Sequence, residues 1–221
     1  MPDGRQLSES VASHVREAIM VGDLPGHGYL RTEHLAAELG VSATPVREAL
    51  MILQGEGAIR WEPRRGYRVL PLTPGDVEDL FGVQAYVAGE LAARAAALLD
   101  QDAVAGLRAA QEQLVDAAAR GEAERVERLN HEVHRTINRA GGTGRLTALL
   151  RQTVSYVPRH YYARVQGWER ASVHDHDDVL DALAAGDRES ARAAMARHVR
   201  HIGVLLDAHL RERGAYRRGS L

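Results

Sequence analysis

Two short segments with helical apolar spacing lie next to each other near the N-terminus, separated by a tight turn. The first starts at Thr32 and stops at Gly40, and the second starts after Ser42. Thr32 and Ser42 are residue types that cap helix N-termini, so we expect both to act as N-caps. One face of the second segment is apolar and consists of Val46, Ala49, Leu50 and Leu53. Two short helices joined in this way predict a helix-turn-helix.

The flanking segments complete a winged helix. Upstream, apolar residues at helical spacing predict a helix over 7–21 that ends at Gly22, a good left-handed C-cap. Downstream, residues 58–62 and 67–70 have the composition of two strands joined by a turn over 63–66. The expected order is therefore a helix, a short helix, a turn, a third helix and a hairpin. Few architectures other than a winged helix have this order.

The hairpin is the most basic stretch of the N-terminal part. All 28 positive side chains of the chain are arginines, and four of them fall here with only Glu62 opposing; they are Arg60, Arg64, Arg65 and Arg68. Arginines on a wing can contact phosphates or enter a minor groove. The alternative is that this arginine-rich segment is an ordinary solvated surface turn without a DNA-binding role. The net charge of −2 argues against a nucleic-acid partner, but the local distribution outweighs it.

A Pro-Leu-Thr-Pro stretch over 71–74 predicts a domain boundary, with Pro74 at the first position of a new helix. Beyond it no strand pattern is present, and six helices are expected near 76–99, 101–120, 122–140, 143–165, 169–185 and 187–212. The expected fold class is mainly α. It consists of a winged helix-turn-helix over 1–72, an antiparallel all-helical bundle of about six helices over 73–214, and a C-terminal tail over 215–221.

The amino-acid composition limits which metal ligands and which cellular location the chain can have. The 221 residues contain no cysteine, which excludes disulfides and thiolate metal sites and leaves histidine, carboxylate and amide ligands for any metal. No run of about eighteen apolar residues is present to cross a membrane, and the N-terminus lacks the pattern of a signal peptide. We therefore expect a cytoplasmic protein without a membrane partner.

Residues 35–50, Leu-Ala-Ala-Glu-Leu-Gly-Val-Ser-Ala-Thr-Pro-Val-Arg-Glu-Ala-Leu, resemble the recognition-helix signature of the GntR family. The resemblance is to the FadR-like branch, which carries a C-terminal FCD ligand-binding domain, and it covers nearly the whole chain. It implies a DNA-binding transcriptional regulator, not an enzyme, that binds double-stranded operator DNA as a homodimer. The family usually has Arg where this chain has Ala43, and a methyl group offers a base only an apolar contact.

The resemblance also implies which residues contact DNA. Arg47 matches the second arginine of the family signature and is the main candidate for a base or phosphate contact. The supporting phosphate contacts are Ser42, Thr44, Arg64, Arg65 and Arg68.

Eight of the 11 histidines lie from His131 onward. The FCD resemblance assigns four positions as ligands of a divalent metal, Zn²⁺ first with Ni²⁺ or Mn²⁺ as alternatives; they are Asn130, His134, His176 and His198. The first two are four residues apart and so share a helix face. The family usually has Asp at the first position, where the neutral amide of Asn130 is a poorer donor. Four nearby histidines are not excluded by spacing alone: His131, His174, His201 and His209.

A small organic acid bound beside the metal is the effector that the resemblance implies, with repression relieved by the effector as the commoner outcome. The family usually has an arginine facing the ligand cavity where this chain has Tyr86, which offers a hydroxyl in place of a charged fork. Further candidates for the effector pocket are Arg135, Arg159, Tyr161 and Tyr162.

Two alternatives remain at this point. A site of three histidines with an open position can activate water, which would make the chain a metal-dependent hydrolase. Asp175 and Asp177 flank His176, but neither has the distinctive placement of a general base. The second alternative is a protein-interaction module with a degenerate winged helix, which Ala43 and the acidic net charge favour slightly.

Overall fold

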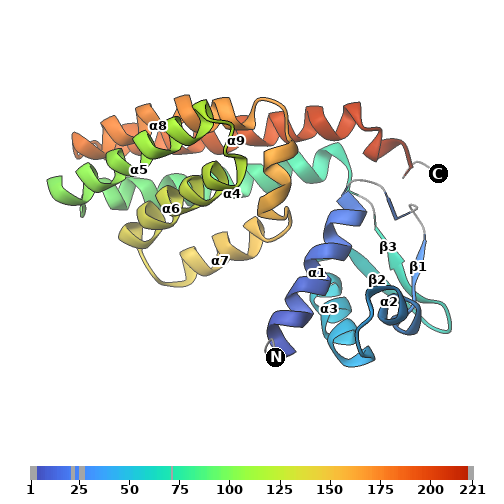
Figure 1. Ribbon diagram of the computed structural model, residues 1–221. Coiled ribbons are helices and arrows are strands. Elements are labelled where there is room, and N and C mark those ends of the chain that lie inside the picture. The colour runs from blue at the N-terminus through green and yellow to red at the C-terminus, as the bar shows by residue number, and fades with distance from the viewer. Residues whose placement is uncertain (1–3, 21–22, 25–27, 71, 219–221) are drawn as a thin grey trace. The chain divides into compact units, whose positions relative to one another are not determined.

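The computed structural model describes residues 4–20, 23–24, 28–70 and 72–218 (Figure 1). The chain forms two compact units. Unit 1 comprises Met1–Asp76, Tyr156–Pro158 and Leu210–Leu221, and unit 2 comprises Val77–Ser155 and Arg159–His209. No helix of the described chain is both long and apolar enough to span a lipid bilayer.

Unit 1 contains a winged helix-turn-helix. Its elements are α1 (Gly4–Met20), β1 (Tyr29–Leu30), α2 (Thr32–Leu39), α3 (Ala43–Gly55), β2 (Ile59–Glu62), β3 (Gly66–Val69) and the short 3-10 helix η2 (Ala215–Arg218). The strands form an antiparallel sheet in the order β1-β3-β2. Strand β1 was not expected, because two residues are too short to show strand alternation. The predicted apolar face of α3 is buried against α1, the helix that precedes the motif.

The helix ends of unit 1 differ in part from expectation. Helix α2 ends at Gly40, whose φ of 65° is the left-handed conformation that glycine adopts readily, as predicted. Thr32 is the first helical residue rather than the N-cap, a position held by Arg31. Ser42 is the N-cap of α3, but its side chain makes no capping hydrogen bond. Helix α1 begins at Gly4 instead of Leu7, and the expected cap at Gly22 lies outside the described residues.

A buried ion pair joins α1 to the end of α3. The Nη2 atom of Arg16 donates to Oε1 of Glu56 at 2.7 Å, and its Nε atom donates to Oε2 at 3.0 Å. Both side chains are more than nine-tenths buried. Two parallel hydrogen bonds of this kind fix the relative orientation of the groups they join, so the pair holds the helix that carries the exposed arginine Arg47 in register with α1.

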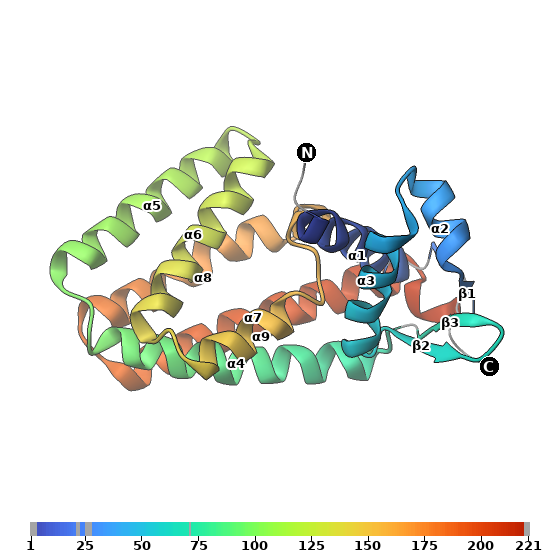
Figure 2. The same ribbon diagram turned by 90° about the horizontal axis from the view of Figure 1, so that it is seen from below.

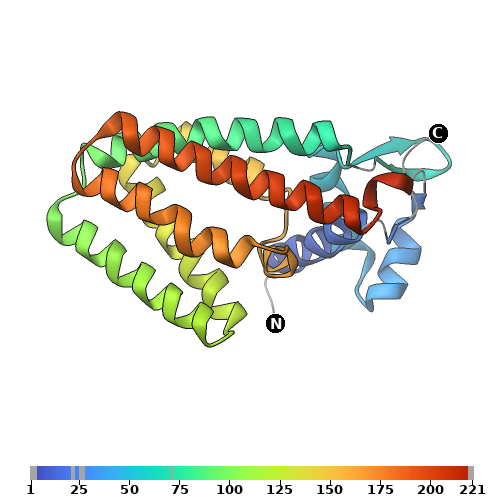
Figure 3. The ribbon, with the colours of Figure 1, turned by 90° about the horizontal axis from the view of Figure 1, so that it is seen from above.

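Unit 2 is all-helical across its described residues. The elements are α4 (Pro74–Ala96), α5 (Gln101–Ala119), α6 (Ala123–Gly141), α7 (Arg145–Val154), the 3-10 helix η1 (Arg159–Arg164), α8 (Trp168–Ala184) and α9 (Arg188–Glu212), of which α4 begins and α9 ends in unit 1. Six α-helices in a bundle after a winged helix confirm the expected fold class. Figure 2 shows α5 and α6 as an antiparallel pair, and Figure 3 shows α8 and α9 side by side.

The start of α4 agrees with its sequence signals. Pro74 is its first residue. The hydroxyl of Thr73 accepts from the backbone N–H of Asp76 at 3.1 Å, and the N–H of Thr73 donates to the Asp76 carboxylate at 2.7 Å. These reciprocal bonds satisfy donors that a helix start leaves free.

The single helix expected over 143–165 is wrong. The structure has α7 up to Val154 and then a separate 3-10 helix from Arg159. Pro158 explains the break, because proline has no N–H to donate and disfavours helical geometry at the residue before it, here Val157.

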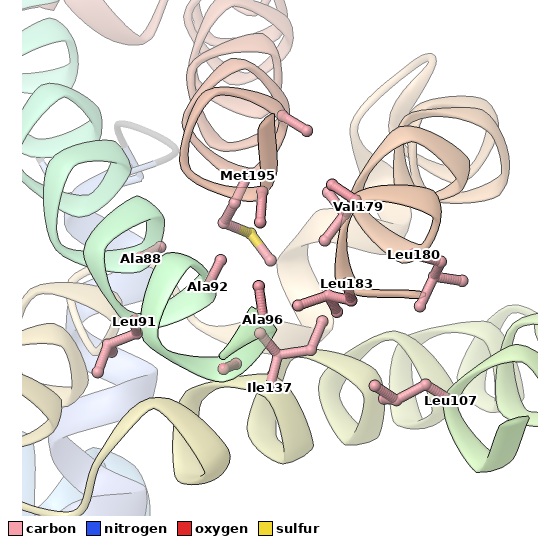
Figure 4. Close-up of a cluster of buried hydrophobic side chains, with 14 of the residues drawn as sticks. Ala88, Leu91, Ala92, Ala96, Leu107, Ile137, Val179, Leu180, Leu183 and Met195 are labelled. Carbon is pink, nitrogen blue, oxygen red and sulfur yellow. The ribbon is translucent and has the colours of Figure 1, made fainter. Parts of the chain in front are cut away.

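Small residues set the packing of unit 2. Figure 4 shows Ala88, Ala92 and Ala96 of α4 in a buried cluster with Met195 of α9 and Leu183 of α8. The end of α6 approaches α4 still more closely, since a Cβ atom on Gly141 would lie 2.1 Å from a backbone oxygen of α4. Only glycine fits there. This close packing holds α6, α8 and α9 around one interior.

Candidate nucleic-acid interface and metal centre

The solvent face of α3 carries the residues expected to contact DNA. Thr44 and Arg47 are exposed, Ala43 is half-buried at the first turn, and Met51 extends the same face. Arg47 forms no hydrogen bond or ion pair with the side chains that the structure describes. Its guanidinium is therefore available to a base edge or a phosphate.

The wing arginines surround one carboxylate. Glu62 lies 3.6 Å from Arg68, 3.9 Å from Arg60 and 4.0 Å from Arg65. The hydroxyl of Tyr29 donates to Glu62 at 2.6 Å and in turn accepts from Arg65 at 3.1 Å. The hydrogen bond from Tyr29, followed by the charges of Arg68 and Arg60, lowers the pKa of Glu62 despite some desolvation. These contacts tether Arg65 and Arg68 to the wing.

Arg64 differs from the other wing arginines. It is exposed at the hairpin turn, where the N–H of Arg65 donates to the carbonyl of Glu62 at 3.2 Å. Its φ of 64° makes it the sole non-glycine residue with positive φ in the described backbone. Such a conformation is strained for a side chain with a Cβ, and strained residues tend to occur at functional sites.

Trp61 is a wing residue that the sequence reasoning missed. In the β2-β3 register Ile59 faces Val69 and Trp61 faces Tyr67, so these four side chains share one face of the hairpin. Ile59 and Val69 are buried, whereas Trp61 lies beyond the core and is 52% exposed. Its ring contacts that of Tyr67 edge-on, with centroids 5.0 Å apart. An exposed tryptophan directly after Arg60 was the available signal.

Three histidines from three helices converge inside unit 2. His134 lies on α6, His176 on α8 and His198 on α9. The Nε2 atom of His134 lies 3.2 Å from that of His198 and 3.3 Å from that of His176. His176 and His198 are 1% and 3% exposed, and His134 is half-buried. We call this cluster the histidine triad.

Burial keeps two histidines of the triad, His134 and His176, neutral. Desolvation, with smaller contributions from His198 and His131, lowers the pKa of His134 to about 3. Desolvation first, then the neighbouring histidines, also lowers the pKa of His176 well below its usual value. Neutral imidazole is the form that ligates metal ions.

The residues fit a divalent metal ion. Imidazole ligands at about 2.0–2.1 Å from a tetrahedral ion stand about 3.3–3.4 Å apart, close to the two Nε2 separations above. The candidate ligand atoms of the triad all lie within 4.8 Å of one another. One turn before His134, the Oδ1 atom of Asn130 is buried and accepts no hydrogen bond from the described residues. A buried oxygen without a partner, one helical turn from a triad histidine, is a further feature that fits a coordination site.

Asn138 is a second residue that the sequence reasoning missed. It lies one turn after His134 on the same face of α6, and its Oδ1 atom is likewise buried without a hydrogen-bond partner among the described residues. Spacing from Asn130 and His134 was the signal that could have found it.

The other candidate histidines do not join the triad in the described structure. His201 is exposed, and its Nδ1 atom lies 2.7 Å from the carboxylate of Asp175. Burial tends to raise the pKa of Asp175, but hydrogen bonds from His198 and His201 prevail and lower it. His131 lies by a groove on α6, His174 is exposed, and His209 contacts Tyr161 edge-on.

The effector-pocket candidates whose side chains are described differ widely in burial. Tyr86 is 65% exposed, because the core face of α4 is occupied by its neighbours Ala85, Val87 and Ala88. A side chain so placed does not line an enclosed cavity, contrary to expectation.

The remaining pocket candidates lie on α6 and η1. Arg135 lines a shallow groove of ≈ 290 Å³ on α6, together with Arg128 and Arg139. In η1, Tyr161 is buried, and burial raises the pKa of the half-buried Tyr162 above its usual range. The side chain of Arg159 lies outside the described residues. Only the two tyrosines therefore have the burial expected of pocket residues.

The N-terminal part is a helix-turn-helix with an exposed arginine and a wing with an arginine turn, and the helical bundle that follows holds three converging histidines. Together these features define a class of protein, a DNA-binding regulator joined to a helical sensor domain.

Comparison with known proteins identifies the family. Residues 7–69 match the gntR family of bacterial regulatory proteins, and residues 79–201 match the FCD domain. The chain belongs to the GntR family of transcriptional regulators, in the FadR-like branch with a C-terminal FCD domain.

Relatives of similar length support this assignment. A helix-turn-helix regulator from an unstable DNA locus of Streptomyces ambofaciens is 30% identical over 90% of this chain and 85% of its own. A repressor assigned to a D-xylose utilization operon of Paenarthrobacter nicotinovorans is 28% identical over 88% of each chain. The solved structure of E. coli McbR/YncC superposes with a TM-score of 0.66 at 24% identity, over 92% of this chain and 98% of that one, and supports the fold.

Family membership decides between the interpretations left open by the sequence. The chain is a DNA-binding transcriptional regulator, and the winged helix is the family's DNA-binding domain. It is not an enzyme, so the interpretation as a metal-dependent hydrolase is wrong. The same finding removes the reason to treat the winged helix as a degenerate interaction module.

Proposed function

We propose that this protein is a metabolite-responsive repressor whose operator affinity is controlled by a small organic acid bound beside a divalent metal ion. Residues 1–72 form the DNA-binding domain, residues 73–214 the effector-binding and dimerisation domain, and residues 215–221 the tail. The observation that carries the sensor role is the histidine triad, three converging imidazoles with the spacing of metal ligands.

At the operator, a homodimer places its two α3 helices in successive major grooves of a near-palindromic site. Arg47 reads a base edge or a phosphate, and Ser42 and Thr44 at the start of α3 bind phosphates. On the wing, Arg64, Arg65 and Arg68 contribute phosphate contacts. Ala43 supplies an apolar contact, for example to a thymine methyl group, in place of the guanidinium usual in the family.

In the sensor domain, His134, His176 and His198 hold the ion, with Zn²⁺ or Ni²⁺ preferred over Mn²⁺ because imidazole is the dominant ligand. Asn130 is the fourth ligand. The ion, when bound, supplies a Lewis-acidic position for a carboxylate. Because three imidazoles and an amide carry no charge, the site favours an anionic effector. Tyr161 and Tyr162 are the protein contacts proposed for it.

Coupling between the two domains requires only that the effector bind one conformation of the dimer more tightly than the other. The repressor assignment follows the Paenarthrobacter relative, which is described as a repressor of a D-xylose utilization operon. Release from the operator on effector binding is the expected direction.

Two measurements test this proposal. Equilibrium dialysis against Zn²⁺, Ni²⁺ and Mn²⁺, followed by elemental analysis, should yield one tightly held ion per chain, and His176→Asn should abolish it while His174→Asn, at an exposed position of the same helix, should not. A mobility-shift assay with DNA upstream of the protein's own gene should then show binding that a panel of small mono- and dicarboxylates relieves only in the metal-loaded protein. Effector response in the metal-free protein, or no DNA binding at low salt, contradicts the proposal.

A further inference from the structure

A buried glutamine of α5 contacts the histidine triad from outside. Gln111 is 4% exposed and donates from its Nε2 atom to two backbone carbonyls of α8, those of Ser172 at 3.1 Å and Val173 at 3.0 Å. Its Oε1 atom lies 2.8 Å from Nδ1 of His176. No sequence motif marks this residue, because its role depends on α5 lying against α8.

These contacts fix which nitrogen of His176 carries the proton. Two carbonyl oxygens can only accept hydrogen bonds, so the amide nitrogen of Gln111 must face them and its oxygen must face the ring. An amide oxygen is also only an acceptor, and the Nδ1 atom of His176 must therefore be protonated. In a neutral ring this leaves Nε2 with a lone pair, directed at the centre of the triad.

Asp175 makes the equivalent contact to the second ring. Its Oδ2 atom lies 3.3 Å from Nδ1 of His198 and 2.7 Å from Nδ1 of the exposed His201. A carboxylate accepts and does not donate, so His198 also carries a proton on Nδ1, and in a neutral ring this leaves Nε2 with a lone pair that faces the triad.

His134 is different, because no described residue hydrogen-bonds its Nδ1 atom. Both short contacts within the triad involve its Nε2 atom, at 3.2 Å to His198 and 3.3 Å to His176. Two lone pairs that face one nitrogen require that nitrogen to be the donor. The metal-free protein therefore holds His134 as the Nε2–H tautomer, between two acceptors.

We propose that Gln111 and Asp175 are positioning residues that preset His176 and His198 in the metal-binding tautomer, so that His134 alone changes tautomer when the ion enters. In that change one proton leaves Nε2 of His134 and one is taken up at its Nδ1 from solvent, with no net release. The role given to these two residues rests on the proposed metal site. The tautomers themselves are properties of the metal-free protein and can be measured without the ion. Partners of this kind orient ligating rings and raise their basicity.

Nitrogen-15 NMR of histidine side chains in the metal-free protein tests the tautomers directly. His176 and His198 should appear as Nδ1–H rings, against the Nε2–H preference of free imidazole, and His134 as Nε2–H. Gln111→Met should return His176 to the Nε2–H form, and Gln111→Glu, which keeps an acceptor for Nδ1, should not. An Nε2–H form of His176 in the wild type, or no change in Gln111→Met, overturns the inference.

Metal affinity gives the second measurement, by competition with a chromophoric chelator for Zn²⁺. Gln111→Met and Asp175→Leu, which both remove the acceptor that faces Nδ1, should each weaken binding by about 10–100-fold. Gln113→Met and Asp177→Leu, at exposed positions of the same helices, should match the wild type. Wild-type affinity in both positioning variants overturns the inference. A wild type that binds no metal instead refutes the proposed function and leaves the tautomer test standing.

Discussion

The two functional regions of this protein use opposite physical means. The candidate DNA interface consists of exposed, permanently charged side chains that lie close together in sequence, with Arg47, Arg64 and Arg65 in one 19-residue stretch of unit 1. The histidine triad consists of imidazole side chains from three helices of unit 2, two of them almost fully buried. Function in the first depends on charge, and in the second on geometry.

This difference predicts how each region fails. Exposed guanidinium groups act through a screened potential, so each contributes a modest and salt-dependent share of the affinity. Ligands of one ion act as a unit, and the loss of one leaves the others without their common partner. The following variants are ordered from the largest expected effect to the smallest.

Removal of one triad ligand should separate the two regions most clearly. His198→Gln should reduce metal affinity by more than the roughly 10–100-fold expected for a positioning residue. DNA affinity of the metal-free protein should change by less than about twofold, because the two regions belong to separate compact units and sites without shared partners are energetically independent. Isothermal titration with Zn²⁺ and a mobility-shift assay measure the two quantities. Comparable losses of metal affinity and DNA affinity would show that the triad and the DNA interface do not act independently.

Removal of the recognition arginine should have the opposite signature. Arg47→Ala should cost about 1–3 kcal/mol of operator binding and leave metal affinity unchanged. Arg170→Ala, an exposed arginine of α8, controls for the change in net charge. Fluorescence anisotropy with labelled operator DNA at several salt concentrations gives the DNA affinity of each of the two variants. Equal losses in the two variants would mean that Arg47 acts through net charge alone.

The same difference explains what could be predicted from sequence. The helix-turn-helix was accessible because its signals are local: Gly40 ends one helix, and the apolar spacing from Val46 to Leu53 defines the buried face of the next. The register that exposes Trp61 was not accessible, since it depends on pairing with Tyr67 on another strand.

In unit 2 local signals were weaker. Spacing alone did not distinguish His134 from His131, and the family resemblance was needed to choose between them. Gln111 has no local signal at all, because its partners lie 61 to 65 residues away in the chain. Pro158 was a local signal for the break between α7 and η1, and the helix predicted over 143–165 did not take it into account.

The lowered pKa of His134 predicts a pH dependence of stability that an exposed basic surface does not share. The folded-state pKa of His134 is lowered to about 3, below the value of about 6.5 for an unfolded chain, so its contribution to stability is complete above pH 6.5 and is lost as the pH falls. Between pH 7 and pH 5 the metal-free protein should lose about 2 kcal/mol of unfolding free energy through this residue. Urea denaturation measures the loss.

The matched variants isolate this contribution. His134→Asn should flatten the pH dependence by most of that amount, and His14→Asn, an exposed histidine of α1, should retain it. Identical pH profiles for wild type and His134→Asn would show that burial does not hold the ring neutral.

The smallest effect expected concerns the wing, where charge and backbone geometry compete at one residue. Arg64 adopts a φ of 64° that is strained for any residue with a Cβ, so Arg64→Gly should stabilise the protein by up to about 1 kcal/mol while removing one phosphate contact. Arg64→Ala should lose the same contact without the gain in stability. Both variants should reduce the slope of log affinity against log salt concentration by about 1. Thermal denaturation and the salt titration together decide whether Arg64 is retained for DNA at the expense of stability. A glycine variant that gains no stability, or binds DNA as the wild type does, would show that it is not.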